Sequence, residues 1–183
     1  MSFAVVLDTC VLYPAHLRDT LLRLAERSLY RPLWSADIVE ELHRNLLKAG
    51  LDETAVSRLG LEMQRAFHDA EVEGYLTLVD SMTCDEKDRH VLAAAVRANA
   101  GAIVTFNVTD FPPASVDPVG VDIIHPADFL LDLLCLAPSV VLSELTNQAA
   151  ANRRAPKTIV ALLDVLGRAG VASFADEVRR HIT

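Results

Sequence analysis

The sequence predicts an α/β fold in which helices cover both faces of a parallel β-sheet. Two apolar runs, FAVVL at residues 3–7 and AIVTF at 102–106, lack polar alternation, which is typical of strands buried on both faces. Asp8 follows the first run, and Asn107 follows the second. Between them, apolar residues recur at helical spacing. We therefore expect a doubly wound domain that binds ligands beyond the carboxyl ends of its strands.

Strands and helices alternate along this domain. Strands are expected at 3–7, 33–34, 75–79, 102–106 and 121–124. Helices are indicated by apolar positions in four segments: Leu17, Leu21, Leu24 and Ala25; Ile38, Val39, Leu42 and Leu46; Leu59, Met63 and Phe67; and Val91, Leu92 and Ala95. Ser35 is a suitable N-cap for the second of these helices, and Gly50 is suited to end it.

Beyond residue 128 the pattern is wholly helical. Pro138 and Pro156 divide this region into three or four short helices, the last running from about Ser173 to His181. We predict a sheet domain over residues 1–128 and a small all-helical C-terminal region over 129–183. Residues 151–157 are expected to be its most exposed connection.

Composition is that of an ordinary globular protein. The chain has 183 residues, of which 51% are hydrophobic and 23% charged, so it can bury its own core. Its three cysteines, Cys10, Cys84 and Cys135, have neither the number nor the spacing of a disulfide framework or zinc cluster. We find no signal peptide or membrane-spanning stretch, and expect a soluble, cytoplasmic protein with no membrane partner.

The charge of the chain is acidic and unevenly distributed. The net charge is −8, yet residues 150–183 hold 6 Lys and Arg against 3 Asp and Glu. An acidic body repels a polyanion such as RNA. If a nucleic acid is the partner, cations must mediate the contact.

Several acidic residues stand at the ends of predicted elements. Asp8 directly follows the first strand and so lies at the ligand-binding edge, although a turn aspartate would also fit this position. Glu40 and Glu41 share the helix that begins after Ser35. Glu41 falls nearer the buried stripe, which makes it the better site candidate, although a surface ion pair remains open for either glutamate.

Two further acids precede the helix around Val91. Asp85 is suited to be its N-cap, and that role is sufficient for it. Asp88 lies on the side that packs against the sheet, where a charge requires a partner or a cation.

Asn107 and Asp110 follow the strand that ends near Thr105. Three or four oxygen ligands converging on one edge of a sheet would repel one another unless a divalent cation lay between them. Carboxylate oxygens suit Mg²⁺ or Mn²⁺, whereas zinc is disfavoured because no His and Cys set accompanies them.

These segments together resemble the PIN domain, the nuclease fold of VapC-type toxins. The matching stretches are VVLDTC, SADIVEEL, DEKDRHVLAAAV and AIVTFNVTDFP, in the same order and with the same placement on strands and helices over residues 3–113. The region after 129 resembles a helical C-terminal extension found in one branch of bacterial PIN proteins. The resemblance implies an endoribonuclease with one or two Mg²⁺ or Mn²⁺ ions.

The resemblance also assigns roles to particular residues. It implies that Asp8, Glu41, Asp88 and Asp110 bind the metal and carry catalysis, with Asn107 as a further possible ligand at a position where many members have aspartate. Thr9 and Thr105 match small hydroxyl positions beside the metals. A small antitoxin protein and a homodimer are the partners it implies. The basic residues Arg153, Arg154 and Lys157 are candidates for RNA contact, although such a cluster is also typical of a solvated turn.

A second hypothesis stays open beside the nuclease. The chain could be a catalytically weakened PIN-like module that binds RNA or a protein. Asn107 favours this alternative, and the four retained acids oppose it. A haloacid-dehalogenase-type phosphatase is excluded because Cys10 stands where its second acid is needed, and dinucleotide binding lacks a GxGxxG motif.

Overall fold

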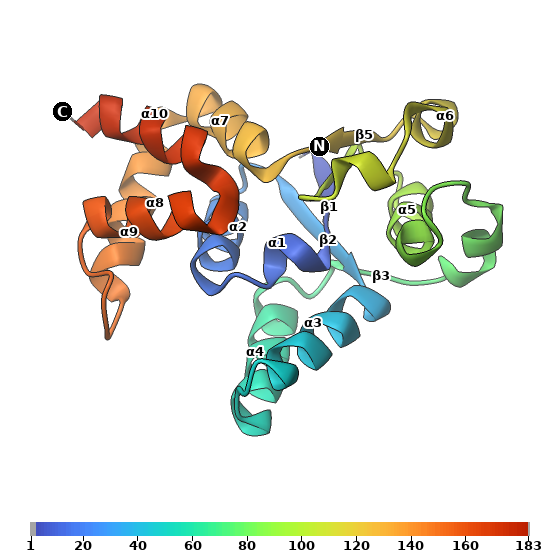
Figure 1. Ribbon diagram of the computed structural model, residues 1–183, viewed down its shortest axis with the longest axis horizontal. Coiled ribbons are helices and arrows are strands. Elements are labelled where there is room, and N and C mark those ends of the chain that lie inside the picture. Colours follow the sequence, from blue (N-terminus) through green and yellow to red (C-terminus); the bar gives the residue numbers. More distant parts are fainter. Residues whose placement is uncertain (1–2, 183) are drawn as a thin grey trace.

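The computed structural model describes residues 3–182, and a five-stranded sheet lies at its centre (Figure 1). The strands are β1 (Ala4–Leu7), β2 (Arg31–Ser35), β3 (Glu71–Val72), β4 (Ala102–Val104) and β5 (Asp122–Ile124). Their order in space is β3-β2-β1-β4-β5, and all neighbours run parallel. The predicted parallel α/β sheet is therefore confirmed.

The two apolar runs of the sequence form the middle of this sheet. Val5, Val6 and Leu7 in β1 are fully buried, as are Ile103 and Val104 in β4. A strand covered on both faces needs apolar side chains on both, which explains why neither run alternates. The carboxyl ends of β1 and β4 consequently lie side by side in the sheet.

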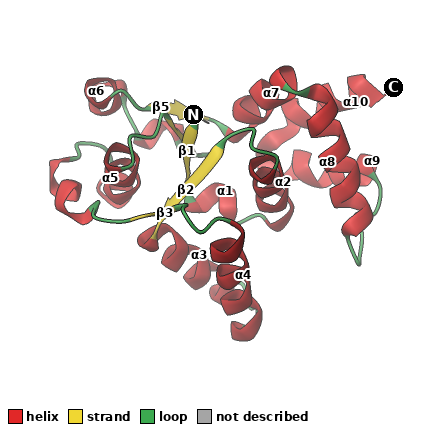
Figure 2. Cartoon of the chain, turned by 180° about the vertical axis from the view of Figure 1, so that it is seen from behind, coloured by secondary structure: helices red, strands yellow, loops and turns green. Residues whose placement is uncertain are grey.

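Helices cover the sheet on opposite sides. Figure 1 shows α5 on one side of the strands and α2 on the other, and Figure 2 shows the same layers from behind. The helices of this domain are α1 (Thr9–Leu12), α2 (Ala15–Glu26), α3 (Ala36–Lys48), α4 (Glu53–Ala66), α5 (Arg89–Arg97) and α6 (Pro113–Val116). Short 3₁₀ helices are η1 (Leu76–Ser81), η2 (Glu86–Asp88), η3 (Val108–Asp110) and η4 (Asp117–Val119). The four segments with helical periodicity correspond to α2, α3, α4 and α5.

Residues 75–79 are not a strand, and that prediction was wrong. They lie largely in η1, and the edge strand is the preceding β3. Gly74, with φ +73°, turns the chain after β3. The Tyr75 hydroxyl then donates a hydrogen bond to Asp37 Oδ2 at 2.7 Å. Tyr75 is buried whereas Leu76 is 66% exposed. The apolar residues of 75–79 therefore do not form the buried face of a strand, and the buried ring of Tyr75 holds the segment in place.

The C-terminal region is helical, as predicted. Its helices are α7 (Pro126–Leu136), α8 (Pro138–Ala151), α9 (Ile159–Leu166) and α10 (Ala172–Ile182). A kinked turn, η5 (Gly167–Val171), joins the last two and contains Gly170 at φ +103°. Pro138 is the first residue of α8, where its missing N–H costs little. Pro156 lies in the connection between α8 and α9.

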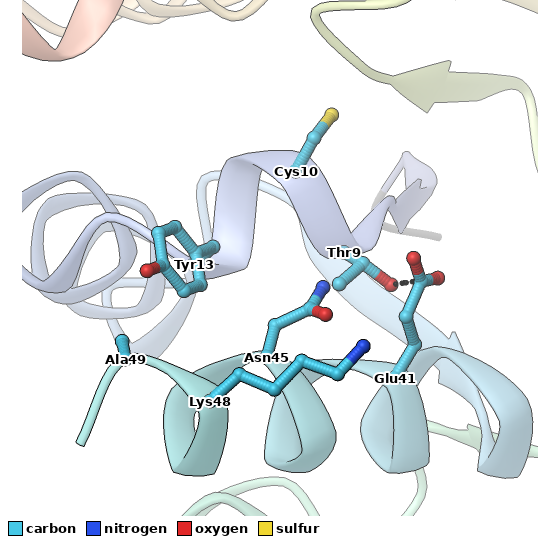
Figure 3. Close-up of a pocket in the computed structure, with 7 residues that line it drawn as sticks. All are labelled: Thr9, Cys10, Tyr13, Glu41, Asn45, Lys48 and Ala49. Atoms are coloured by element: carbon cyan, nitrogen blue, oxygen red, sulfur yellow. Dashed lines mark hydrogen bonds between the residues drawn. The ribbon is translucent and has the colours of Figure 1, made fainter. Parts of the chain in front are cut away.

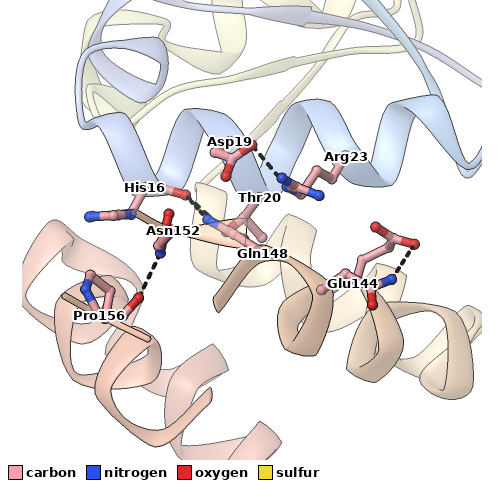
Figure 4. A network of polar contacts seen from close by, with 9 residues as sticks. His16, Asp19, Thr20, Arg23, Glu144, Gln148, Asn152 and Pro156 are labelled. Atoms are coloured by element: carbon pink, nitrogen blue, oxygen red, sulfur yellow. Dashed lines mark hydrogen bonds and ion pairs between the residues drawn. The ribbon is translucent and has the colours of Figure 1, made fainter. Parts of the chain in front are cut away.

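Buried contacts fasten the C-terminal region to α2 (Figure 4). Gln148 in α8 is 1% exposed. Its Oε1 accepts a hydrogen bond from Thr20 Oγ1 at 2.8 Å, and its Nε2 donates one to the backbone oxygen of His16 at 2.9 Å. Nearby, the rings of Tyr30 and Phe129 pack edge to face with centroids 4.9 Å apart. The helical region is thus part of the same packed core.

No single helix in residues 3–182 is long and apolar enough to cross a membrane. Only α7 and α8 taken together reach that length and composition, and they meet at an angle of 117°.

Candidate active site

Asp8 is the central residue of the candidate site. It directly follows β1, the middle strand, and is 4% exposed. Its Oδ1 accepts a hydrogen bond from the Thr9 N–H at 2.7 Å, and its Oδ2 accepts one from Thr105 Oγ1 at 2.7 Å. Its backbone N–H donates to the oxygen of Val104 at 3.1 Å and continues the pairing of β1 with β4. The sheet therefore fixes the backbone of Asp8, and two donors orient its carboxylate.

Thr105 links the ends of β1 and β4. It is fully buried, and its hydroxyl donates to Asp8 while accepting a hydrogen bond from the Asn107 N–H at 3.0 Å. One side chain thereby orients the central acid and begins the turn that leads to η3. The Thr105 hydroxyl, which the PIN resemblance places beside the metals, is in contact with Asp8.

Glu41 reaches the same edge of the sheet from α3. Its Oε2 lies 3.0 Å from the Thr9 hydroxyl, which is also 3.2 Å from the backbone oxygen of Ile38. Glu41 is half-buried, whereas Glu40 is exposed, as helical periodicity indicated. The helix begins at the predicted cap, because Ser35 Oγ accepts a hydrogen bond from the Ile38 N–H at 3.3 Å.

Asp88 and Asp110 are held in two turns that are joined to each other. The Asp85 N–H donates to the backbone oxygen of Asp110 at 3.1 Å, and Asp85 Oδ1 caps η2 by accepting from the Lys87 N–H at 3.1 Å. Burial raises the pKa of Asp88 to about 6, and neighbouring negative charges add to the effect. In decreasing order, these charges belong to Asp8, Asp110, Asp85 and Glu41. The acids of four separate segments therefore share one electrostatic field.

Cys10 is a residue of this site that the sequence did not single out. Its thiol lies 3.2 Å from Asp8 Oδ2 and 3.3 Å from Thr105 Oγ1, and its sulfur accepts a hydrogen bond from the Phe106 N–H at 3.2 Å. Burial, followed by the charge of Asp8, raises the pKa of the thiol to about 12. Cys10 is thus a neutral donor that ties α1 to the segment after β4. Cys10 lies two residues after Asp8, and this spacing could have identified it as a residue of the site.

A cavity of about 510 Å³ opens beside these residues, between α1 and α3 (Figure 3). Thr9 and Glu41 form part of its wall, together with Tyr13, Asn45 and Lys48. The sequence did not predict Tyr13, Asn45 or Lys48 as site residues. Asn45 and Lys48 repeat the face of Glu41 along α3, and this spacing could have identified them.

The donor set suits a hard divalent cation in its chemistry, because all four predicted acids offer carboxylate oxygens. The mutual repulsion expressed in the raised pKa of Asp88 is what a cation would relieve. Within residues 3–182, however, no group of three or more Asp, Glu, His or Cys side chains lies close enough to hold an ion. The acids share one edge of the sheet, and their side chains would have to rotate to hold one ion together.

Asn107 lies at the margin of this cluster, whereas the predicted basic residues lie apart from it. Asn107 is exposed, and it is its backbone N–H that contacts Thr105. Arg153, Arg154 and Lys157 are exposed in the connection between α8 and α9. Figure 1 places that connection at the far tip of the C-terminal helices, away from the end of β1. The three basic residues are therefore separated from the acids.

Comparison with known proteins is consistent with this arrangement. Residues 4–109 match the model of the PIN domain, and residues 126–180 match that of the VapC50 C-terminal domain. A Mycobacterium tuberculosis (strain ATCC 25618 / H37Rv) protein named "Putative ribonuclease VapC50" is 42% identical over 107 residues, which are 58% of this chain and 63% of that protein. The match thus spans less than two thirds of this relative. No solved structure matches the chain significantly. Because the PIN model covers more than half of the chain, including Asp8, Glu41 and Asp88, the chain belongs to the PIN-domain family.

Proposed function

We propose that the protein is a divalent-cation-dependent endoribonuclease that cleaves RNA phosphodiester bonds as the toxin of a VapBC-type pair. The observation that carries this proposal is the electrostatic coupling of Asp8, Glu41 and Asp110 to Asp88 at the end of a PIN-domain sheet. The similarity to a relative named as a ribonuclease supports the same activity.

The chain's own residues have distinct roles in this proposal. Asp8, Glu41, Asp88 and Asp110 would hold one or two Mg²⁺ or Mn²⁺ ions. Such ions, when bound, supply Lewis-acid stabilisation of the charge on phosphoryl oxygens. The hydroxyls of Thr105 and Thr9 orient Asp8 and Glu41 by the hydrogen bonds described above.

Charge makes a cation necessary for RNA binding at this site. The protein has a net charge of −8, and ionised carboxylates at the end of β1 would repel a phosphate. Divalent ions reverse the sign of this pocket, which allows an acidic protein to bind a polyanion in the cytoplasm, where RNA is abundant.

The same acids make the site suited to an antitoxin. A guanidinium binds carboxylates through two parallel hydrogen bonds, so an arginine from a small antitoxin would compete with cations for the cluster. We further propose that the toxin forms a homodimer. Size-exclusion chromatography with light scattering, alone and after co-expression with the antitoxin, measures both associations.

A second candidate function is an RNA-binding or protein-interaction module with weakened catalysis. Two observations favour it: no three acidic side chains converge in the described residues, and Asn107 occupies a position where an aspartate would add a ligand. A module without a metal centre gains no thermal stability from Mn²⁺, whereas a cation site in the folded state must.

Cleavage of mixed tRNA and structured RNA by the purified protein tests the proposal. We expect cleavage with Mg²⁺ or Mn²⁺ and none with EDTA. Asp8→Asn should lower the rate by at least about a hundredfold, because the central ligand loses its charge while its shape is kept. Asp132→Asn, an exposed change in α7, is the matched control and should cleave like the wild type. If Asp8→Asn cleaves as fast as Asp132→Asn, the acid cluster is not catalytic.

A further inference from the structure

We propose that the groove between α1 and α3 binds the RNA nucleotide adjacent to the scissile phosphate. In this proposal the base stacks on Tyr13, the Asn45 amide reads its edge and Lys48 pairs with a backbone phosphate. The inference rests on the proposed nuclease function and adds to it a subsite that selects the sequence to be cut.

The groove has the size and continuity that a nucleotide subsite needs. Its volume of about 510 Å³ lies within the range of roughly 300–1,000 Å³ typical of ligand sites. Thr9 and Glu41 form both its inner wall and part of the candidate active site. A strand of RNA whose phosphate lies at the acids would therefore place its next nucleotide in this groove.

The side chains along α3 are arranged in order of charge. Glu41, Asn45 and Lys48 lie on one face of the helix, over a length of about 10 Å. Figure 3 shows the Asn45 amide facing the groove and the Lys48 chain running along α3 toward Glu41. The row begins with an acid at the cation site, and the Lys48 ammonium is directed back toward that acid, where it would suit a backbone phosphate close to the cation site.

Tyr13 supplies an aromatic surface on the opposite wall. It follows α1 directly, and although it is aromatic it is 40% exposed. An exposed ring beside a cation is the usual means of binding single-stranded RNA, because every base can stack on it. The Asn45 amide offers both a donor and an acceptor, so it can distinguish between base edges.

Lys48 distinguishes RNA from an antitoxin as the occupant. An antitoxin arginine would bind the acid cluster itself and would gain nothing from the Lys48 ammonium, which carries a like charge. The phosphate of an RNA strand is attracted to the same ammonium. The charge order of the groove therefore favours a nucleotide.

The first test is photo-crosslinking, which does not depend on cleavage. A randomised ten-nucleotide RNA containing 4-thiouridine is irradiated with the wild type and with Asp8→Asn in Mn²⁺, and the crosslinked peptides are identified by mass spectrometry. We expect crosslinks at Tyr13 in both proteins. Crosslinks confined to other surfaces, such as residues 151–157, would overturn the proposal whether or not the protein is a nuclease.

The second test compares cleavage by groove variants. Sequencing the products of a randomised RNA should show a base preference beside the cut that is lost in Asn45→Ala. Tyr13→Ala and Lys48→Gln should each raise KM by about tenfold, while Tyr13→Phe keeps the ring and restores KM. Arg44→Gln, an exposed change in α3 outside the groove, is the matched control for Lys48→Gln.

The outcomes separate this proposal from the nuclease itself. Metal-dependent cleavage with unchanged KM and base preference in all groove variants would reject the subsite and leave the nuclease intact. Groove substitutions that weaken binding of a co-expressed antitoxin and leave RNA cleavage unchanged would identify a protein-docking groove and also reject it. Loss of crosslinking and cleavage in every protein would reject both.

Discussion

At the scale of single residues, the candidate site is organised by hydroxyl and thiol groups as much as by acids. The Asp8 carboxylate meets Thr105, Cys10 and the backbone of Thr9 within hydrogen-bond distance. Such groups fix the direction of a carboxylate without neutralising its charge, so the acid remains able to bind a cation. Orientation and charge are thus supplied by different side chains.

The raised pKa of Asp88 leads to a prediction about how the stability of the fold depends on pH. The pKa of this carboxyl is raised from 3.8 to about 6, so the folded protein binds this proton more tightly than the unfolded chain, and the fold loses stability as the pH rises from about 4 to about 6. In EDTA at pH 7.5, Asp88→Asn should therefore raise the free energy of unfolding. The expected gain is only about 1 kcal/mol, because solvent screens the partly exposed carboxylate. At pH 4.5 the gain should largely disappear. Urea titrations at the two pH values measure both results.

Asp132→Asn controls for the loss of one negative charge from an acidic protein. It should show little gain at either pH, because its side chain is exposed. An Asp88→Asn variant that is no more stable than Asp132→Asn at pH 7.5 would mean that burial and the neighbouring acids do not disfavour the charge of Asp88 as described.

At the scale of elements, features that depend on neighbouring residues could be predicted from the sequence, whereas features that depend on contacts between distant segments could not. α3 begins at Ser35, and Gly50, at φ +87°, follows its C-cap, because caps depend on neighbours within a few residues. The acids were predicted for a similar reason. Asp8 directly follows a strand and Asp110 lies in the turn after another. Glu41 and Asp88 lie on the inner side of a predicted helix. Residues 75–79 were misassigned because the Tyr75 to Asp37 hydrogen bond joins distant segments. Tyr13 and Lys48 were not predicted as site residues, because the groove forms only where α1 packs beside α3.

The turn between α9 and α10 packs against the active-site segment. Gly170 has φ +103°, and a Cβ there would lie 2.7 Å from Cε1 of Phe106, the residue after Thr105. Gly170→Ala should cost about 2–4 kcal/mol from strain and displacement of the ring, and it should slow cleavage. Urea unfolding and RNA cleavage of the variant measure the two effects.

Gly50→Ala separates backbone strain from the contact with Phe106. Gly50 has a similar φ of +87° but no atom within 4 Å of its Cβ position, so its substitution should cost only about 1–2 kcal/mol. Equal losses in the two variants would show that the ring contact has no energetic weight.

At the scale of the whole molecule, the sheet domain and the helical region share buried polar contacts. Gln148→Leu removes the donor to His16 and the acceptor of Thr20, so it should cost about 1–3 kcal/mol. We nevertheless expect one unfolding transition. Trp34, the single tryptophan, reports on β2 by fluorescence, while far-ultraviolet circular dichroism reports on helices throughout the chain.

Coincident curves from these two probes would establish one cooperative unit. Gln64→Leu, an exposed change in α4, is the control and should leave stability within about 0.5 kcal/mol of the wild type. A loss of helix that precedes the change in Trp34 fluorescence would instead show that residues 129–182 unfold on their own.

The hydrogen bond between Thr20 and Gln148 joins positions that are 128 residues apart. Replacing Thr20 leaves the buried Gln148 Oε1 without this donor, whereas after replacement of Gln148 the Thr20 hydroxyl keeps its hydrogen bond to the backbone oxygen of His16 at 2.9 Å. A change at Thr20 is consequently expected to accompany a change at Gln148. Among descendants of one ancestral chain, α2 and α8 should therefore carry a correlated record of change, even where the residues between them vary independently.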